Sequence, residues 1–360
     1  MSSHQSTSPI DDLMTVDAPP AAAKHAAAPA ESHRRRRLIA LAIVGVLLLL
    51  VGSAFTWYLV TRKPLTALPG INVAQTPRYT YSFYSVTAPL GVAVTPDGER
   101  LYVTQQDVDS PVLILDRAGH RIGQLKVPPA VKGKATSHTL WYVAVDKSSG
   151  NVFVSDRTGH AVQVYSADGV FLRSIEPTSL KGVWEPLGIT LADDGTIYVA
   201  DVSAKGGGRI LALTQDGQVT RTLSVTGSGA RPLNYPNGLL VDGDGNLIVA
   251  DSSNARVLMF DKDGMASVVA GAGSGAGDVG MPRGLAIDDK GQLLVVDTTN
   301  SQVSVYKAPV PGEVGQYLGS FGVEGSNDGA FEYPNGIATD ARAKVYITDR
   351  VNNRIQVWSY

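Results

Sequence analysis

From residue 79 onward the chain is a succession of short apolar runs, and none shows the three-and-four spacing of an amphipathic helix. Side chains within a run alternate between apolar and polar positions, as in LYVTQ, IYVAD and VYITD. Turns rich in Gly, Asn and Asp, such as PDG, DDG and DGDGN, separate consecutive runs. Alternation with a period of two, interrupted by tight turns, predicts antiparallel strands joined by hairpins.

The runs form six copies of one pattern. Each copy starts with a run that usually contains Pro-x-Gly, passes through a turn into a β-branched run, and continues into a third and usually a fourth run. Steps of 51, 46, 50, 46 and 52 residues separate the equivalent positions, which are Gly91, Tyr142, Gly188, Gly238, Gly284 and Gly336. Four strands repeated six times predict an all-β fold, a six-bladed β-propeller.

The last copy lacks a fourth run, because the chain stops after RIQVWS and one further residue. An unassigned run, YTYSFYSV at 79–86, precedes the first copy and has the character of a fourth strand. We expect it to pair beside RIQVWS and to close the ring within one blade. Such closure removes an exposed strand edge that would otherwise favour aggregation.

A different pattern precedes the repeats. LIALAIVGVLLLLVGSAFTWYLV, residues 38–60, contains no charge, and as a helix it is roughly 34 Å long, enough for the hydrocarbon core of a bilayer. Arg34 to Arg37 precede it, and Trp57 and Tyr58 lie at its far end. These flanks predict a single-pass membrane anchor with a cytoplasmic N-terminus. The alternative is a signal peptide cleaved near residues 52–54, although a typical signal core of about 7–15 residues is shorter.

Composition sets the remaining boundaries. Residues 1–37 are rich in Ser, Ala, Pro and His without apolar periodicity, and we expect a disordered cytoplasmic tail. Residues 61–78 contain three prolines and are expected to be a linker, so the propeller spans 79–360 outside the cell membrane. The formal net charge of −2 gives no attraction to polyanions, and no nucleic-acid partner is expected. The absence of cysteine excludes disulfides and thiolate metal sites.

Two stretches of the last copy, GVEGSNDGAFEYPNGIATD at 322–340 and VYITDRVNNRIQVW at 345–358, resemble the NHL-repeat family. The resemblance extends over the repeats and implies a six-bladed propeller. The second copy departs from the pattern because it lacks the Pro-Gly pair, and the first has Gln105 where the others have Asp. The order of tail, anchor and propeller also resembles the extracytoplasmic half of bacterial sensor proteins, without their kinase.

An aspartate ends the second run of five copies, and these residues are Asp156, Asp201, Asp251, Asp297 and Asp349. One interpretation is a ring of carboxylates that binds a cation at the channel. The other is that each carboxylate accepts backbone N–H groups of a neighbouring turn. Repetition in nearly every blade favours the second interpretation, because a single binding site needs asymmetry.

The positions that differ between copies are candidates for ligand recognition. The residue after each first-run proline, or its equivalent, is Leu90, Trp141, Leu187, Asn237, Arg283 or Asn335. Two positions earlier stand Ala88, Thr139, Glu185, Tyr235, Met281 and Tyr333. Both sets are expected around the channel mouth, although Trp141 and Leu187 could instead fill the channel. Because Tyr, Trp and Arg are enriched at binding hot spots, the predicted ligand-binding residues are Arg283, Asn237, Asn335, Tyr235, Tyr333, Trp141 and Glu185.

The same positions bear on catalysis. The resemblance includes a peptide α-amidating lyase that places His after the proline to bind zinc, and no His occupies this set here. Six-bladed lactonases hold calcium with Glu, Asn and Asp, which Glu185, Asn237 and Asn335 could mimic. No catalytic residue, metal ligand or cofactor is predicted. The predicted function is a binding or scaffolding module for an extracytoplasmic protein, peptide or glycan, and the alternative is a lactonase-like or lyase-like enzyme.

Overall fold

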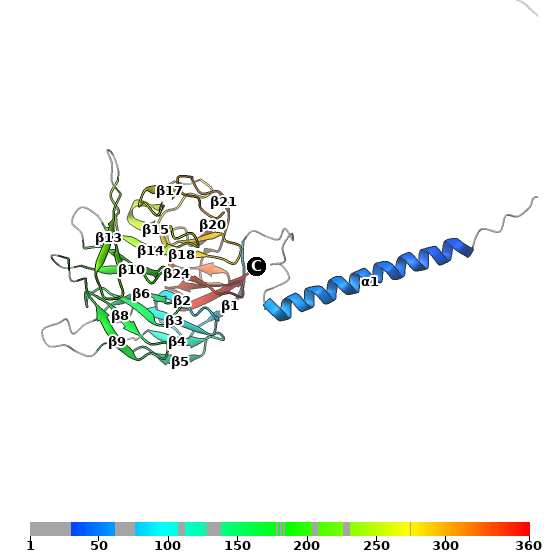
Figure 1. Cartoon of the computed structure of the whole chain (residues 1–360), viewed down its shortest axis with the longest axis horizontal. Helices are drawn as coiled ribbons and strands as arrows, with labels where there is room; N and C mark the ends of the chain where they lie inside the picture. Colours follow the sequence, from blue (N-terminus) through cyan, green and yellow to red (C-terminus); the bar gives the residue numbers. More distant parts are fainter. Residues whose placement is uncertain are drawn as a thin grey trace, which may run out of the picture. The chain divides into compact units, whose positions relative to one another are not determined.

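A computed structural model of the chain describes residues 30–61, 76–106, 112–126, 128, 138–177, 179–180, 182, 184–203, 208–225, 231–273 and 275–360. Residues 1–29 of the predicted tail and 62–75 of the predicted linker lie outside this set. The described residues form a helical segment and a propeller (Figure 1).

The propeller consists of six four-stranded antiparallel sheets, which confirms the predicted six-bladed all-β fold (Figure 1). Blade 1 contains β2 (Pro89–Val94), β3 (Arg100–Gln105), β4 (Leu113–Asp116) and β5 (Arg121–Gln124). Blade 2 contains β6 (Leu140–Val145), β7 (Val152–Asp156), β8 (Ala161–Tyr165) and β9 (Phe171–Ile175). Blade 3 contains β10 (Pro186–Leu191), β11 (Ile197–Asp201), β12 (Arg209–Leu213) and β13 (Val219–Leu223). Blades 4 and 5 contain β14 (Pro236–Val241), β15 (Leu247–Asp251), β16 (Arg256–Phe260) and β17 (Ala266–Ala270); β18 (Pro282–Ile287), β19 (Leu293–Asp297), β20 (Gln302–Tyr306) and β21 (Tyr317–Phe321). Blade 6 contains β24 (Pro334–Thr339), β25 (Lys344–Asp349), β26 (Arg354–Ser359) and β1 (Arg78–Phe83).

Two short elements lie outside the blades. A parallel ribbon of β22 (Val323–Glu324) and β23 (Ala330–Phe331) precedes blade 6, and the 3-10 turn η2 (Ser252–Asn254) follows β15. Neither element was expected from the sequence, because each is only two or three residues long.

The N-terminal strand closes the ring, as predicted. β1 pairs antiparallel with β26, with Phe83 opposite Ile355 and Arg78 opposite Ser359. The ring of Tyr79 packs edge-on against Trp358 with centroids 5.8 Å apart. The two ends of the repeat array are therefore held together by a backbone ladder and by aromatic packing.

The first strand of each blade is innermost, because β2, β6, β10, β14, β18 and β24 contact one another in a ring around the channel. The second and third strands are buried on both faces, since each blade packs against its neighbours. The apolar cores accordingly lie between adjacent blades, as with Phe153 of blade 2 and Leu211 of blade 3. Outer strands such as β9 keep exposed positions, which explains their weaker apolar pattern.

The inner-strand glycines mark the closest approach between blades. A Cβ atom at Gly188 would lie 1.7 Å from the carbonyl oxygen of Asn237, and one at Gly238 would lie 1.9 Å from that of Arg283. No side chain fits such gaps without moving backbone, so five of the six copies have glycine. The sixth has Tyr142, whose placement is described below.

The helix α1 (Ala30–Thr61) contains the predicted span of residues 38–60 and begins eight residues earlier than expected. Within the described part of the chain, no helix combines the length and the apolar character needed to cross a membrane.

Candidate functional site

The two faces of the propeller differ in the parts of the inner strands that they present. We call the face at which the inner strands begin the mouth face, and the face at which they end the turn face. The loops that follow the second strand of each blade, and the loops that lead into each inner strand, lie on the mouth face. All predicted site residues belong to the mouth face or to the channel behind it.

The aspartates that end the second strands support the loops of the mouth face. Asp251 is fully buried, and its Oδ1 accepts the backbone N–H of Asn234 at 2.7 Å. Its Oδ2 accepts Asn254 Nδ2 at 2.8 Å and Arg256 Nε at 2.7 Å. In the other blades the equivalent carboxylates accept the backbone N–H of Thr139, Glu185, Met281 and Glu332. The geometry therefore fits the architectural interpretation, and the described residues contain no cluster of His, Asp and Glu suited to a metal ion.

The residues after the prolines lie deeper than the sequence suggested. Asn237 and Asn335 are 1 % and 0 % exposed, and Leu90 and Leu187 are also fully buried. This corrects the expectation that both asparagines line an open mouth, because their amides are used for hydrogen bonds inside the channel. Arg283 remains partly exposed.

Tyr142 closes the channel between the two asparagines. Its hydroxyl lies 3.2 Å from Asn237 Oδ1, to which it donates, and 3.2 Å from Asn335 Nδ2, from which it accepts. Asn335 Nδ2 also donates to the carbonyl oxygen of Leu90 at 2.9 Å. Burial raises the pKa of Tyr142 to about 12, so the hydroxyl stays protonated at neutral pH. The residue was missed as a site candidate, although its replacement of the repeat glycine was the signal that could have found it.

Two arginines flank one tyrosine at the mouth face. The Cζ atoms of Arg283 and Arg350 lie 5.3 and 5.4 Å from the ring centroid of Tyr333. Arg283 Nη1 donates to Asn335 Oδ1 at 2.7 Å, and Arg350 Nη2 donates to Gln106 Oε1. Among the described residues, neither guanidinium forms an ion pair with a carboxylate. We call Arg283, Arg350 and Tyr333 the arginine cluster.

Blade 2 contains a neutralised counterpart of Arg350. Arg157 also follows the second-strand aspartate, and its Nε and Nη2 donate to Glu185 Oε2 at 2.9 and 2.7 Å. Glu185 belongs to the next blade, and the next blade after Arg350 has Ala88 at that position. Although burial opposes it, Glu185 raises the pKa of Arg157, whereas burial and the charge of Arg283 lower the pKa of Arg350. Arg350 was not predicted, because only the comparison between blades reveals its missing partner.

The predicted site residues of the mouth face lie at two separate shallow hollows. A hollow of about 390 Å³ is lined by Thr139, Trp141, Arg157, Thr158, His160 and Glu185. A second hollow of about 440 Å³ is lined by Ala88, Gln106, Tyr333, Arg350, Val351 and Asn353. The hydroxyl of Tyr235 accepts Arg157 Nη1 at 2.6 Å, beside the first hollow. The structure therefore separates Trp141, Glu185 and Tyr235 from the arginine cluster.

Backbone strain accompanies both tyrosines of the mouth face. Tyr235 and Tyr333 have φ values of 55° and 60°, in the left-handed region that residues other than glycine rarely occupy. Such strain costs about 1–3 kcal/mol and persists where the surroundings hold it in place. The loops of the mouth face therefore hold the backbone of both tyrosines in this conformation.

Comparison with known proteins identifies the repeats. A family model, the NHL repeat, matches residues 233–260 and 280–306. NHL repeat-containing protein 3 of Homo sapiens is 30 % identical over 112 residues, which cover 29 % of this chain and 32 % of the relative. Its Mus musculus counterpart is 26 % identical over 196 residues, which cover 51 % of this chain and 54 % of the relative. The chain thus spans between a third and about half of these relatives, and their animal origin does not support the expected kinship with bacterial sensors.

Among solved structures, a streptogramin B lyase matches with a TM-score of 0.55 at 17 % identity, covering 80 % of this chain and 99 % of the lyase. An identity this low shows a shared fold and nothing of activity. The chain therefore contains NHL repeats and folds as a six-bladed β-propeller.

Proposed function

We propose that the chain is a membrane-anchored binding module whose arginine cluster captures a carboxylate-bearing group of an extracytoplasmic protein, peptide or glycan. One observation carries the proposal. Arg350 lacks a carboxylate at the position where Glu185 neutralises Arg157, although both arginines occupy the same place in their blades. A ligand carboxylate would supply the missing partner.

The geometry of the cluster suits such a ligand. A guanidinium group donates in a planar fork that matches a carboxylate, and such charge-assisted hydrogen bonds are stronger than neutral ones. Tyr333 is 36 % exposed and offers an amphipathic ring beside both arginines. The hollow of about 440 Å³ next to Arg350 leaves room for the rest of a bound group.

Replacing Arg350 by alanine is expected to weaken binding about 30-fold, because the loss of one central anchor typically costs about 2 kcal/mol. The full chain would be titrated against an array of acidic peptides and uronic-acid glycans, each paired with its amidated counterpart. The wild-type protein should prefer the free carboxylates, and the variant should lose that preference.

The matched control is Arg231→Ala, since Arg231 is an exposed arginine on the mouth face whose Nη1 donates to a backbone carbonyl at 3.3 Å. Its removal should leave binding unchanged. An Arg350→Ala protein that binds the carboxylate ligands with wild-type affinity, and still prefers them to their amidated counterparts, would contradict the proposed site.

The membrane anchor is the second part of the proposal, and it rests on the uncharged run of residues 38–60 in the full sequence, only part of whose side chains the structure describes. α1 continues without a break through residues 38–60, and Leu41, Leu48 and Val51 are each 67 % exposed. A long exposed apolar surface is unfavourable in water and calls for a membrane or a partner. The basic flank at Arg34–Arg37 favours a cytoplasmic N-terminus.

Protease added to intact cells should therefore degrade the propeller while a cytosolic marker protein stays whole. The measurement is immunoblotting with an antibody against the propeller, before and after lysis. Protection of the propeller in intact cells and its digestion only after lysis would contradict the proposed topology.

One observation favours an enzyme as the second candidate. His160 lines the first hollow, and its Nδ1 lies 2.7 Å from the carbonyl oxygen of Trp184, to which it donates, so the neutral ring in this position is the Nδ1–H tautomer. Nε2 is then left unprotonated and able to accept a proton, as a general base must. Lactone hydrolysis or elimination that a His160→Ala variant loses would establish this function instead of the binding module.

A further inference from the structure

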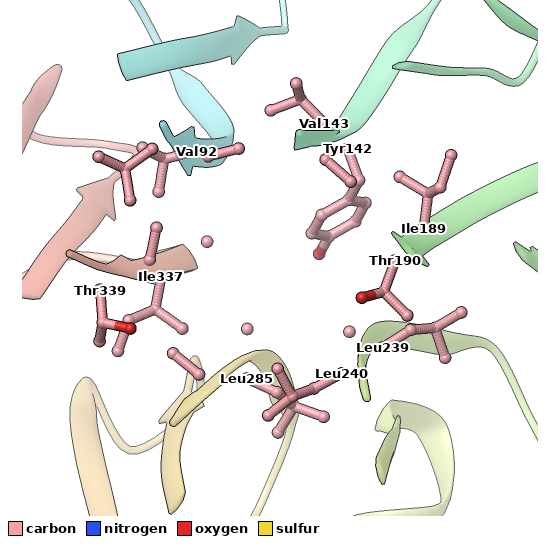
Figure 2. A pocket seen from close by; sticks show the side chains of 18 of the residues that line it. Val92, Tyr142, Val143, Ile189, Thr190, Leu239, Leu240, Leu285, Ile337 and Thr339 are labelled. Atoms are coloured by element: carbon pink, nitrogen blue, oxygen red, sulfur yellow. The ribbon is translucent and has the colours of Figure 1, made fainter. Parts of the chain in front are cut away.

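The central channel opens on the turn face as a cavity of about 420 Å³ (Figure 2). Its wall is built from one apolar side chain per blade, each 6–7 % exposed: Val92, Val143, Ile189, Leu239, Leu285 and Ile337. Tyr142 points into the middle of this ring (Figure 2), and its hydroxyl is already bonded to Asn237 and Asn335. We call this cavity the funnel. The six side chains form an apolar ring, and Thr190, Thr339 and Lys147 also line the cavity. The Lys147 ammonium is paired with Asp193 at 3.0 Å, and Tyr142 closes the mouth end.

The rim of the funnel is acidic. The hairpin turns that connect first and second strands surround the opening, and their carboxylates are Asp97, Glu99, Asp146, Asp193, Asp194, Asp242, Asp244, Asp288, Asp289 and Asp340. Cations of the same turns pair with acids, as Lys147 does with Asp193 at 3.0 Å and Arg342 with Glu99 at 2.5 Å. A rim of one charge sign around a cavity with low-dielectric walls focuses the electric field at the opening.

One acidic part of the rim adjoins the funnel at blades 3 and 4. A hollow of about 280 Å³ lies between the turns of blades 3 and 4, and it shares Gly243 with the funnel. Asp194 and Asp244 line this hollow and are exposed. Within the described residues the Asp244 carboxylate has no hydrogen bond or ion pair, so its charge is available to a ligand.

We propose that the funnel binds a small amphiphilic amine, with the apolar body inside the ring of six side chains and the ammonium group at Asp194 and Asp244. The walls favour an apolar group, and the satisfied hydroxyl of Tyr142 offers no free polar anchor at the bottom. The rim attracts a cation and repels a carboxylate. The funnel volume lies within the roughly 300–1,000 Å³ typical of small-ligand sites. The site is independent of the arginine cluster, because Tyr142 closes the channel between them.

The test uses three probes that share a phenyl group: 2-phenylethylammonium, 2-phenylethanol and 3-phenylpropionate. Dissociation constants would be measured by saturation-transfer NMR on the full chain in neutral lipid nanodiscs, with empty nanodiscs as the reference. At low salt we expect the ammonium probe to bind at least tenfold more tightly than the carboxylate probe. Added salt should reduce that preference, since exposed charges are screened.

Two pairs of variants locate the site. Gly243→Phe should abolish binding, because the phenyl ring would cover the opening of the funnel. Gly271→Phe, on the mouth face, is its control and should leave binding unchanged. A Cβ atom at either glycine meets nothing within 4 Å. Asp244→Lys should weaken the binding of the ammonium probe and strengthen the binding of the carboxylate probe. Asp216→Lys makes the same charge change at an exposed outer turn of blade 3 and should leave the affinity for both probes unchanged.

Preference for the carboxylate probe, or saturable binding that Gly243→Phe leaves intact, would overturn the proposal. The absence of saturable binding by any probe would also overturn it and would show that the funnel only results from blade packing.

Discussion

Replacement of Asp349 by alanine is expected to lower the free energy of unfolding by about 3–5 kcal/mol, because it removes the only buried counter-charge among the described partners of a buried arginine. The other carboxylate near Arg354, that of Asp328, lies 3.8 Å away and is 65 % exposed. Arg354 is 2 % exposed, and its Nε donates to Asp349 Oδ2 at 2.7 Å. The same carboxylate accepts the backbone N–H of Glu332 at 2.7 Å and Gln356 Nε2 at 3.0 Å. Asn352 Nδ2 donates to it at 2.9 Å. Four donors would therefore lose this acceptor in the blade that closes the ring.

Denaturant unfolding of the full chain, followed by near-ultraviolet circular dichroism, measures this loss. Asp168→Ala is the matched control, since Asp168 pairs with Arg100 at 2.9 Å but its side chain is 79 % exposed. Exposed pairs contribute about 0–1 kcal/mol, so the control should unfold close to the wild type. Similar midpoints for both variants would show that the buried carboxylate does not hold the closing blade together.

The strands and their closure could be predicted from the sequence, because both depend on local patterns. Alternation with a period of two identifies each strand, and the turns between strands identify the hairpins. The unassigned run before the first copy and the missing fourth strand of the last copy together predict the pairing of β1 with β26, which the structure confirms. Periodicity also predicts a structural role for the aspartates, because a residue that recurs in nearly every blade supports the fold of each blade, whereas a single binding site needs asymmetry.

The contents of the channel could not be predicted in the same way. The repeat aligns Asn237 with Arg283 and Asn335, yet it does not tell how deep each side chain lies. Tyr142 and Asn335 are 193 positions apart in sequence and meet only because blades 2 and 6 face the same channel. A large side chain at one glycine position fills space that five glycines leave, so the asparagines face Tyr142 and not solvent.

The depth of the channel residues, which the sequence does not tell, also changes the expected effect of removing Arg283. An exposed arginine on a loop could be removed with little effect on stability. Arg283 instead donates to the buried amide of Asn335, and its Nε is buried without a partner. Its removal would disturb a buried hydrogen-bond network, which typically costs about 1–3 kcal/mol. Arg350 is therefore the cleaner probe of binding, although the sequence drew attention to Arg283.

The comparison between blades also provides the sharpest test of the proposed ligand. Ala88 occupies the repeat position of Glu185 and lines the same hollow as Arg350, with a φ of 40° that Glu185 does not share. Replacing Ala88 by glutamate would therefore bring a carboxylate into the hollow of Arg350. We expect the affinity for a carboxylate ligand to fall about 100-fold, or about 3 kcal/mol, because the new side chain neutralises Arg350 and repels the ligand. Calorimetric titration with the strongest ligand of the peptide and glycan array would measure the loss.

Ala88→Gln is the control for this substitution, since glutamine has the same size and shape as glutamate but carries no charge. It should bind within a few-fold of the wild type, and both variants should keep the wild-type melting temperature because Ala88 is partly exposed. Equal losses for glutamate and glutamine would indicate steric obstruction and not charge. Unchanged affinity in the Ala88→Glu protein would contradict the proposed contact between the ligand and Arg350, because Ala88 and Arg350 line one hollow.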